Sequence, residues 1–271
     1  MSKIALCFLV TKNLENLEIW EKWWKDKEDK VSIYVHYDKK GVTQDLLTEN
    51  KIKKTVKTKW GDLSLVKAEK NLYEEALKDK DNKYFLLLSE TCLPIREFSY
   101  VYRRLNRSPK GIISYNQWDP YGKDDDYVPF IDKPKCIKIL KEFSFFTKVY
   151  TADQLKVLGR KNAIDFIKMT EDKKYKELFS AFCIEVVPDS VAPDELMFIN
   201  YLKWKYKKLS KEIRQGLVTY VDFKEKDSVH PKSYKNLTKN LENLICDTNA
   251  MFARKFVNTN KKLKKNIPVK C

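Results

Sequence analysis

Glycine and histidine are scarce in this sequence of 271 residues, which contains six glycines and two histidines. The GxGxxG and GxxxxGK patterns, whose backbone amides cradle phosphate groups, are absent. The GxSxG turn that presents a nucleophilic serine is absent as well. His36 and His230 alone cannot form an HExxH or a histidine-rich metal site. These absences exclude dinucleotide-binding and P-loop phosphate sites, GxSxG hydrolases and HExxH metalloproteases.

Paired cysteines and long apolar runs are also missing. None of the six cysteines lies in a CxxC pair, which excludes a zinc pattern and a dense disulfide framework. A single bridge such as Cys183–Cys246 remains open. No run of about 18 apolar residues occurs, and residues 1–10 pass into Thr11 without a small-residue cleavage site. We therefore expect no signal peptide and no transmembrane segment, and a cytoplasmic or peripheral membrane location.

Positive charge is abundant, with 54 Lys and Arg against 38 Asp and Glu and a net charge of +16. A basic surface attracts nucleic acid, anionic membrane or a phosphorylated ligand. Most of the lysines are spread among acids, which favours a solvated surface, and only residues 261–265 form a dense block. We expect one domain over residues 1–256, followed by a Lys-rich tail over 257–271. The tail is expected to be a frayed terminus, with weak contact with an anionic membrane surface as the alternative.

Short apolar runs alternate with amphipathic segments along the chain. This alternation predicts a single-domain α/β fold, with a central sheet flanked by helices. The carboxyl ends of the strands at His36 and Ser89 are where such a sheet binds a ligand. Strands are predicted at 4–10, 31–36, 52–58, 84–89, 111–115, 218–221 and 251–253, and helices at 14–27, 63–78, 98–106, 153–168 and from 193 onwards.

The stretch from Val191 to Leu202 predicts a helix start. Pro193 suits the first helical position, and Asp194 and Glu195 lie next to the positive end of the helix dipole. Spacing alone favours a capping role for both acids. The functional alternative is that one carboxylate removes a proton from a substrate.

Two acidic clusters resemble metal ligands. Asp79-Lys80-Asp81 has the DxD form of many nucleotide-sugar enzymes, but it precedes a strand instead of following one, so it indicates a solvated turn. Asp124, Asp125 and Asp126 lie in a polar, aromatic segment over 116–135 and indicate an exposed acidic loop. Neither cluster predicts a metal site.

Five motifs occur in a fixed order along the sequence. Each motif is weak alone, but together they resemble the core-2/I-branching glycosyltransferase family, especially its plant and microbial members, from about Lys3 to Phe256. The strand that ends at His36 and Asp38 fits the same pattern. The motifs are Trp60–Glu69 (WGDLSLVKAE), Tyr84–Ile95 (YFLLLSETCLPI), Pro193–Glu195, His230–Pro231 and Phe252–Phe256 (FARKF).

The resemblance implies a GT-A-type fold and an inverting transferase. The enzyme would move a sugar such as GlcNAc or xylose from a UDP-sugar to a hydroxyl of a glycan or protein-linked sugar, with no metal or other cofactor. The catalytic base of the family maps onto Glu195, and a basic residue that stabilises the leaving diphosphate maps onto Lys255. A second basic position falls near Lys232 or Lys235, where a lysine lacks the bidentate fork of the usual arginine.

Further contacts follow from this resemblance. We expect an acceptor glycan or glycoprotein to bind Trp118 and Tyr121. His36 has an alternative role as a backbone hydrogen-bonding partner, and Asp62 as a helix cap. Two other functions remain open: a basic protein that binds nucleic acid or anionic glycans, and a catalytically inactive relative that binds sugar nucleotide. With a transferase, no nucleic acid partner is expected. The predicted donor-binding residues are His36, Asp38, Trp60, Asp62, Ser89, Glu90, Lys232, Arg254 and Lys255.

Overall fold

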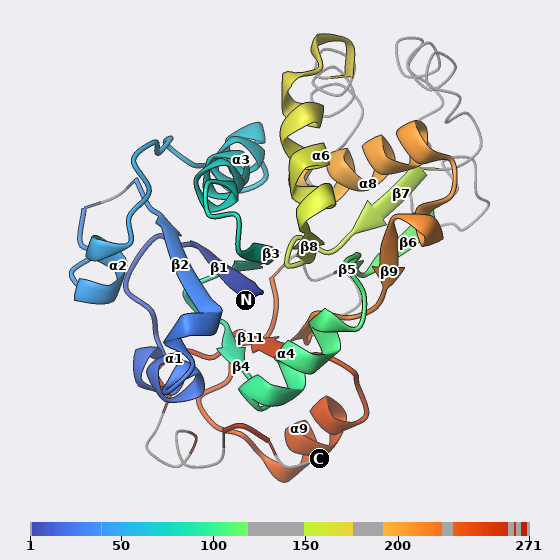
Figure 1. Ribbon diagram of the computed structural model, residues 1–271. Helices are drawn as coiled ribbons and strands as arrows, with labels where there is room; N and C mark the ends of the chain where they lie inside the picture. The colour runs from blue at the N-terminus through green and yellow to red at the C-terminus, as the bar shows by residue number, and fades with distance from the viewer. Residues whose placement is uncertain are drawn as a thin grey trace.

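The computed structural model describes residues 2–38, 40–118, 149–175, 192–223, 230–259, 263 and 267–269. Within these ranges the centre is a mixed six-stranded sheet in the order β2-β1-β3-β8-β5-β9 (Figure 1). Helices lie on both sides of the sheet, so the predicted α/β fold is confirmed. The strands are β1 (Lys3–Leu9), β2 (Val31–His36), β3 (Asn82–Leu88), β5 (Gly111–Ile113), β8 (Val157–Gly159) and β9 (Ile213–Gln215).

Aromatic side chains attach helices to opposite faces of the sheet. Trp20 of α1 packs on Phe8 with ring centroids 5.3 Å apart, and Tyr73 of α3 packs on Phe85 at 6.2 Å. Phe85 pairs with Ala5 of β1, three residues before Phe8, so the two phenylalanines point to opposite faces. Figure 1 accordingly shows α3, α6 and α8 above the sheet and α1, α4 and α9 below it. The helices are α1 (Leu17–Trp24), α2 (Asp45–Glu49), α3 (Leu63–Leu77), α4 (Phe98–Asn106), α6 (Arg160–Glu171), α8 (Pro193–Tyr206) and α9 (Lys239–Cys246).

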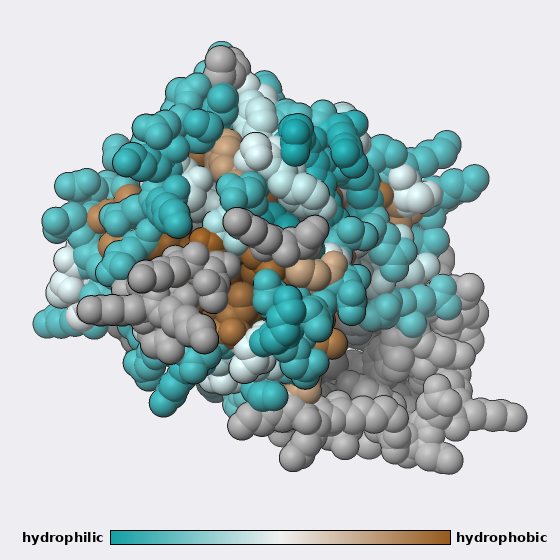
Figure 2. All heavy atoms as spheres, turned by 90° about the horizontal axis from the view of Figure 1, so that it is seen from below, coloured by the Kyte–Doolittle hydropathy of each residue, from teal (hydrophilic) through white to brown (hydrophobic). Residues whose placement is uncertain are grey.

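A smaller sheet joins the late part of the chain to the turn that follows β3. Its order is β10-β11-β4, with β10 (Thr219–Val221) parallel to β11 (Phe252–Arg254) and β4 (Leu93–Pro94) antiparallel to it. The same late part contributes to a second hydrophobic cluster. The view from below shows a mostly hydrophilic face with hydrophobic residues gathered near its middle (Figure 2).

Part of the Lys-rich segment over 257–271 packs on this domain. Leu263, Ile267 and Val269 are buried in the second hydrophobic cluster. The Val269 N–H donates to the Ile95 carbonyl at 3.0 Å. The apolar residues between the lysines therefore anchor the described part of this segment.

Two predicted elements are wrong. Residues 52–58 do not form a strand, because only Lys51 makes an isolated bridge, with Val35. The helix predicted over 153–168 begins only at Arg160, and β7 (Val149–Ala152) and β8 precede it. β8 pairs with β3, and a Cβ on Gly159 would lie 2.0 Å from the Pro109 carbonyl oxygen. Glycine at that position allows the close approach that ends β8.

The oxidation state is known for three of the cysteines that the structure describes. Cys7 and Cys92 are buried and free, and Cys246 is disulfide-bonded. Cys183 lies outside the described residues, so its pairing with Cys246 stays a prediction. Within the described ranges, no helix combines the length and apolar character that crossing a bilayer requires.

Candidate functional site

The carboxyl ends of three parallel strands define one edge of the central sheet. Leu9 of β1 pairs with His36 of β2, and Phe8 pairs with Leu88 of β3. The residues that follow His36 and Leu88 therefore leave the sheet at the same edge. This is the edge at which an α/β sheet presents polar groups to a ligand.

The turn after β3 is held by local hydrogen bonds. The Cys92 N–H donates to the Ser89 carbonyl at 3.1 Å, and the Ser89 hydroxyl lies 3.2 Å from the Cys92 sulfur. Glu90 accepts a hydrogen bond from the Thr11 hydroxyl at 3.0 Å. β4 follows and pairs Leu93 with Ala253 of β11. The structure therefore brings Ser89 and Glu90 close to the strand that carries Arg254, and their role in donor binding stays a prediction.

Arg254 and Lys255 bring two adjacent cations to this turn. Arg254 ends β11, and its Nε is buried without a hydrogen-bond partner. Burial lowers the pKa of Lys255, and the charge of Arg254 lowers it further, while Glu90 opposes the shift. In the part of the chain that the structure describes, neither cation forms an ion pair. The binding of an anionic ligand by these two cations stays a prediction.

Lys232 lies beside Lys255 along the backbone. The Lys255 N–H donates to the Lys232 carbonyl at 3.4 Å, and the Tyr234 N–H donates to the Lys255 carbonyl at 2.8 Å. The Lys232 ammonium, on a side chain 45% exposed, is 4.0 Å from an Asp222 carboxylate oxygen. That carboxylate also accepts a hydrogen bond from the Tyr234 hydroxyl. Lys232 thus shares its charge with Asp222, and its contact with a diphosphate stays a prediction, as does the alternative through Lys235.

Glu195 lies in the first turn of α8, which begins with Pro193 as the sequence predicts. The Glu195 N–H donates to the Ala192 carbonyl at 3.0 Å, which fixes the backbone of this turn. Burial raises the pKa of Glu195 to about 7, with further contributions from Asp194 and Asp153. Lys156 and Arg254 oppose that rise. Near neutral pH this carboxylate is therefore poised to accept a proton.

Arg254 connects the two halves of the site. Its charge acts on Glu195 and also on Cys92, in the turn after β3. Arg254 is therefore close enough to influence both the turn after β3 and the start of α8. Asp194 is 5% exposed, and one of its oxygens is buried without a hydrogen-bond partner.

His36 and Asp38 each hold the backbone of the segment that follows β2. The Val56 N–H donates to His36 Nε2 at 3.0 Å, and the Thr58 N–H donates to an Asp38 oxygen at 2.8 Å. These side-chain bonds explain why residues 52–58 need no strand partner. The backbone role of His36 is therefore confirmed. His36 Nδ1 and the second Asp38 oxygen are buried and make no hydrogen bond to another described side chain, and the contact of either residue with a donor stays a prediction.

Trp60 and Asp62 flank the turn before α3. Asp62 caps the helix as predicted, because its carboxylate accepts from the Ser64 N–H at 2.8 Å. The hydrogen bonds from Ser64 lower the pKa of Asp62. Trp60 is 61% exposed, and its ring centroid is 5.6 Å from that of His230. An exposed indole at this position is compatible with a nucleotide contact, which stays a prediction for both residues.

The acceptor-binding predictions fall at the limit of the described chain. Trp118 ends β6 (Tyr115–Trp118), which pairs antiparallel with β7. Tyr121 and the acidic residues 124–126 lie outside the described residues. The contact of Trp118 and Tyr121 with an acceptor is therefore a proposal from sequence.

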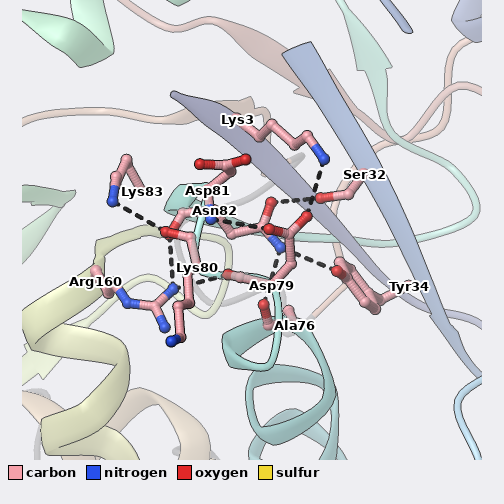
Figure 3. Close-up of polar contacts among 10 residues, drawn as sticks. All are labelled: Lys3, Ser32, Tyr34, Ala76, Asp79, Lys80, Asp81, Asn82, Lys83 and Arg160. Atoms are coloured by element: carbon pink, nitrogen blue, oxygen red, sulfur yellow. Dashed lines mark hydrogen bonds and ion pairs between the residues drawn. The ribbon is translucent and has the colours of Figure 1, made fainter. Parts of the chain in front are cut away.

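Asp79-Lys80-Asp81 forms a turn just before β3 (Figure 3). Glu90 follows the other end of that strand. Asp79 pairs with the Lys3 ammonium at 3.0 Å and accepts from the Asp81 N–H at 2.8 Å. The Arg160 guanidinium donates to the Asp79 carbonyl at 2.9 Å. These contacts confirm that the DxD-like sequence is a structural turn. Among the described residues, no group of three or more His, Cys, Asp or Glu side chains could hold a metal ion.

A buried ion pair next to this site was not found by sequence reasoning. Glu69 of α3 and Lys156 are 1% and 2% exposed, and their charged atoms are 2.9 Å apart. The available signal was a glutamate between Val66 and Tyr73 on the buried stripe of α3. Lys156 gave no comparable signal, because its segment was predicted to be helical.

The mixed α/β sheet flanked by helices is consistent with a glycosyltransferase domain of GT-A type. The sequence model of the "Core-2/I-Branching enzyme" family matches residues 4–254. The chain therefore belongs to the core-2/I-branching family of glycosyltransferases. It is similar to the rice protein "Glycosyltransferase BC10" (Oryza sativa subsp. japonica), with 30% identity over 108 residues. That match covers 37% of this chain and 27% of the rice protein, so the chain spans about a quarter of the relative's length.

Proposed function

We propose that this chain is an inverting, metal-independent glycosyltransferase that uses a UDP-sugar. It would transfer a sugar such as GlcNAc or xylose to a hydroxyl of a glycan or a protein-linked sugar. Family membership and the name of the rice relative support a sugar transferase. The observation that carries the proposal is Glu195, a half-buried carboxylate with a pKa of about 7 that lies within electrostatic reach of Arg254.

In the proposed reaction Glu195 acts as the general base. The acceptor oxygen attacks the anomeric carbon from the face opposite the nucleotide and gives its proton to Glu195. The new bond to the acceptor oxygen forms while the bond from the anomeric carbon to the phosphate oxygen breaks. A base works best when its pKa lies near the operating pH, and the buried start of α8 provides such a value.

Arg254 and Lys255 would stabilise the leaving UDP. Negative charge develops on the diphosphate as the sugar departs, and fixed cations aimed at that charge lower the barrier. Both side chains are partly buried, and a partly buried charge interacts more strongly with an anion than a fully solvated one does. Metal independence is supported by the family resemblance and by this cation pair at the edge next to β3, and a transfer assay with and without EDTA tests it. Loss of transfer on chelation would contradict it.

The experiment that tests the base is Glu195→Gln, because the amide keeps the size of the side chain and cannot accept the proton. We expect UDP-sugar affinity in calorimetry to stay within about threefold of wild type, while transfer falls by about 10²-fold or more. Glu97→Gln on the exposed start of α4 is the matched control and should leave both values unchanged.

The donor is identified by a thermal-shift screen over UDP, GDP and UDP-sugars. UDP binding without transfer or hydrolysis of any UDP-sugar would favour a catalytically inactive relative. Retained transfer in Glu195→Gln would remove Glu195 from the role of base. Steeply salt-dependent oligonucleotide binding without UDP affinity would favour a basic nucleic-acid-binding protein instead.

A further inference from the structure

A chain of buried polar groups lies behind the start of α8. The Lys156 ammonium contacts a Glu69 oxygen at 2.9 Å and donates to the Gln154 carbonyl at 3.0 Å. The Tyr73 hydroxyl donates to the same Glu69 oxygen at 2.7 Å. The ammonium also lies 5.8 Å from the centre of the Phe166 ring. A buried charge pair of this kind is weak support for stability alone, so its position calls for another role.

These buried polar groups interact with α8 through Asp194. Lys156 acts on the Asp194 carboxylate through its charge, and the side chain of Gln154 interacts with it. One oxygen each of Asp194 and Glu69 is buried without a hydrogen-bond partner. One ammonium group is thus shared among more carboxylates than it can neutralise. α3 and α6 both pack against α8, so the surrounding helices fix the position of that ammonium.

We propose that Lys156, held in place by Glu69 and Tyr73, is a positioning residue whose fixed charge sets the protonation of Glu195. The inference rests on the proposed role of Glu195 as the base. Lys156 does not touch the reacting atoms, and it acts through Asp194 and Glu195. Glu69 pairs with Lys156 and thereby weakens the electrostatic effect of the Lys156 ammonium on the carboxylates of α8.

The charged groups around Glu195 come from several elements. Asp194 lies on α8, Asp153 and Lys156 lie just before β8, and Arg254 ends β11. Asp194 and Lys156 shift the pKa of Glu69, but Glu69 is not among the groups that shift Glu195 itself. The groups that face the ion pair in turn are Tyr73 of α3, Cys7 of β1, Phe166 of α6 and the Gln154 carbonyl.

This arrangement predicts shifts of opposite sign for the two partners. Lys156→Met removes a positive charge, so Glu195 holds its proton to a higher pH. The acid limb of the pH profile of kcat/KM should move up by about one pH unit. Glu69→Gln removes a negative charge and leaves Lys156 to the carboxylates of α8, so the limb should move down. A role in folding alone would lower the amount of active enzyme without moving the limb in either variant.

Either single variant leaves a buried charge without its partner and is at risk of misfolding. The double variant Lys156→Met/Glu69→Met replaces both side chains with apolar ones of similar volume and removes both charges. Replacing a buried ion pair in this way is often neutral or stabilising. Because Lys156 acts on Glu195 directly and Glu69 acts only through Lys156, the double variant should fold and still show the limb moved up. Tyr73→Phe, which removes one donor from Glu69, should move the limb slightly.

A second readout separates this inference from the proposed function. Carbon-13 NMR of labelled glutamate follows the Glu195 carboxyl directly, and Glu195→Gln assigns its signal. A higher titration midpoint in the folded double variant would support the inference even in an inactive preparation. An unchanged midpoint and an unchanged acid limb would overturn it. Full transfer activity in Glu195→Gln would instead overturn the proposed function.

Discussion

The raised pKa of Glu195 has a consequence for stability that does not depend on the reaction. The pKa rises from an ordinary value of 4.5 to about 7 in the folded chain, mainly because the carboxyl is buried. The folded state therefore binds a proton more tightly than the unfolded state does. The resulting stabilisation is fully present below pH 4.5 and is lost as the pH rises through 7.

The size of this effect follows from the two pKa values. At about 1.4 kcal/mol per pH unit, the rise from 4.5 to about 7 corresponds to about 3 kcal/mol of stability lost on ionisation. Glu195→Gln cannot ionise and does not lose it. We expect this variant to gain stability relative to wild type from pH 4.5 to pH 8, with a total change of about 3 kcal/mol. Functional residues that lower the stability of the folded protein are common in enzymes.

Urea denaturation of wild type and Glu195→Gln across this pH range is the assay. The difference in the free energy of unfolding should increase steadily with pH and level off above pH 8. Glu97→Gln, on an exposed side chain, controls for the loss of a glutamate and should give a flat difference. A flat difference for Glu195→Gln, or one that decreases with pH, would refute the argument that burial raises its pKa.

Two further predictions concern the cation pair and the helix cap. Lys255→Ala should weaken UDP binding by about tenfold or more, the size of a lost charge-assisted hydrogen bond. Calorimetry measures this loss, with the exposed Lys22→Ala on α1 as the unchanged control, and equal affinities would remove Lys255 from the diphosphate site. Asp62→Ala should lower the free energy of unfolding by about 1 kcal/mol, because the Ser64 N–H loses its acceptor. Asp62→Asn keeps a capping oxygen and should stay close to wild type in urea, so equal losses in both variants would contradict the cap.

The buried strands of the central sheet could be predicted because their apolar runs are continuous. β1, β2 and β3 lie within two residues of their predicted positions. Local sequence also carried the start of α8 at Pro193 and the cap at Asp62, since both depend on a few neighbouring residues. Strand β8 could not be found in this way. It is three residues long and exists because it pairs antiparallel with β3, a long-range contact that no local pattern encodes.

The same distinction applies to the candidate site. The sequence motifs predicted Glu195 and Lys255 as site residues. They did not predict Lys156, which acts on Glu195 and lies in a segment that was predicted to be helical. Lys156 directly precedes β8, and its ammonium lies 2.9 Å from the carboxylate of Glu69 on α3. A lysine in a basic chain of net charge +16 gives no sign that it is the buried one. Two cations therefore act on Glu195 at the start of α8. Arg254 could be predicted because it lies in a sequence motif, whereas Lys156 could be found only from the folded structure.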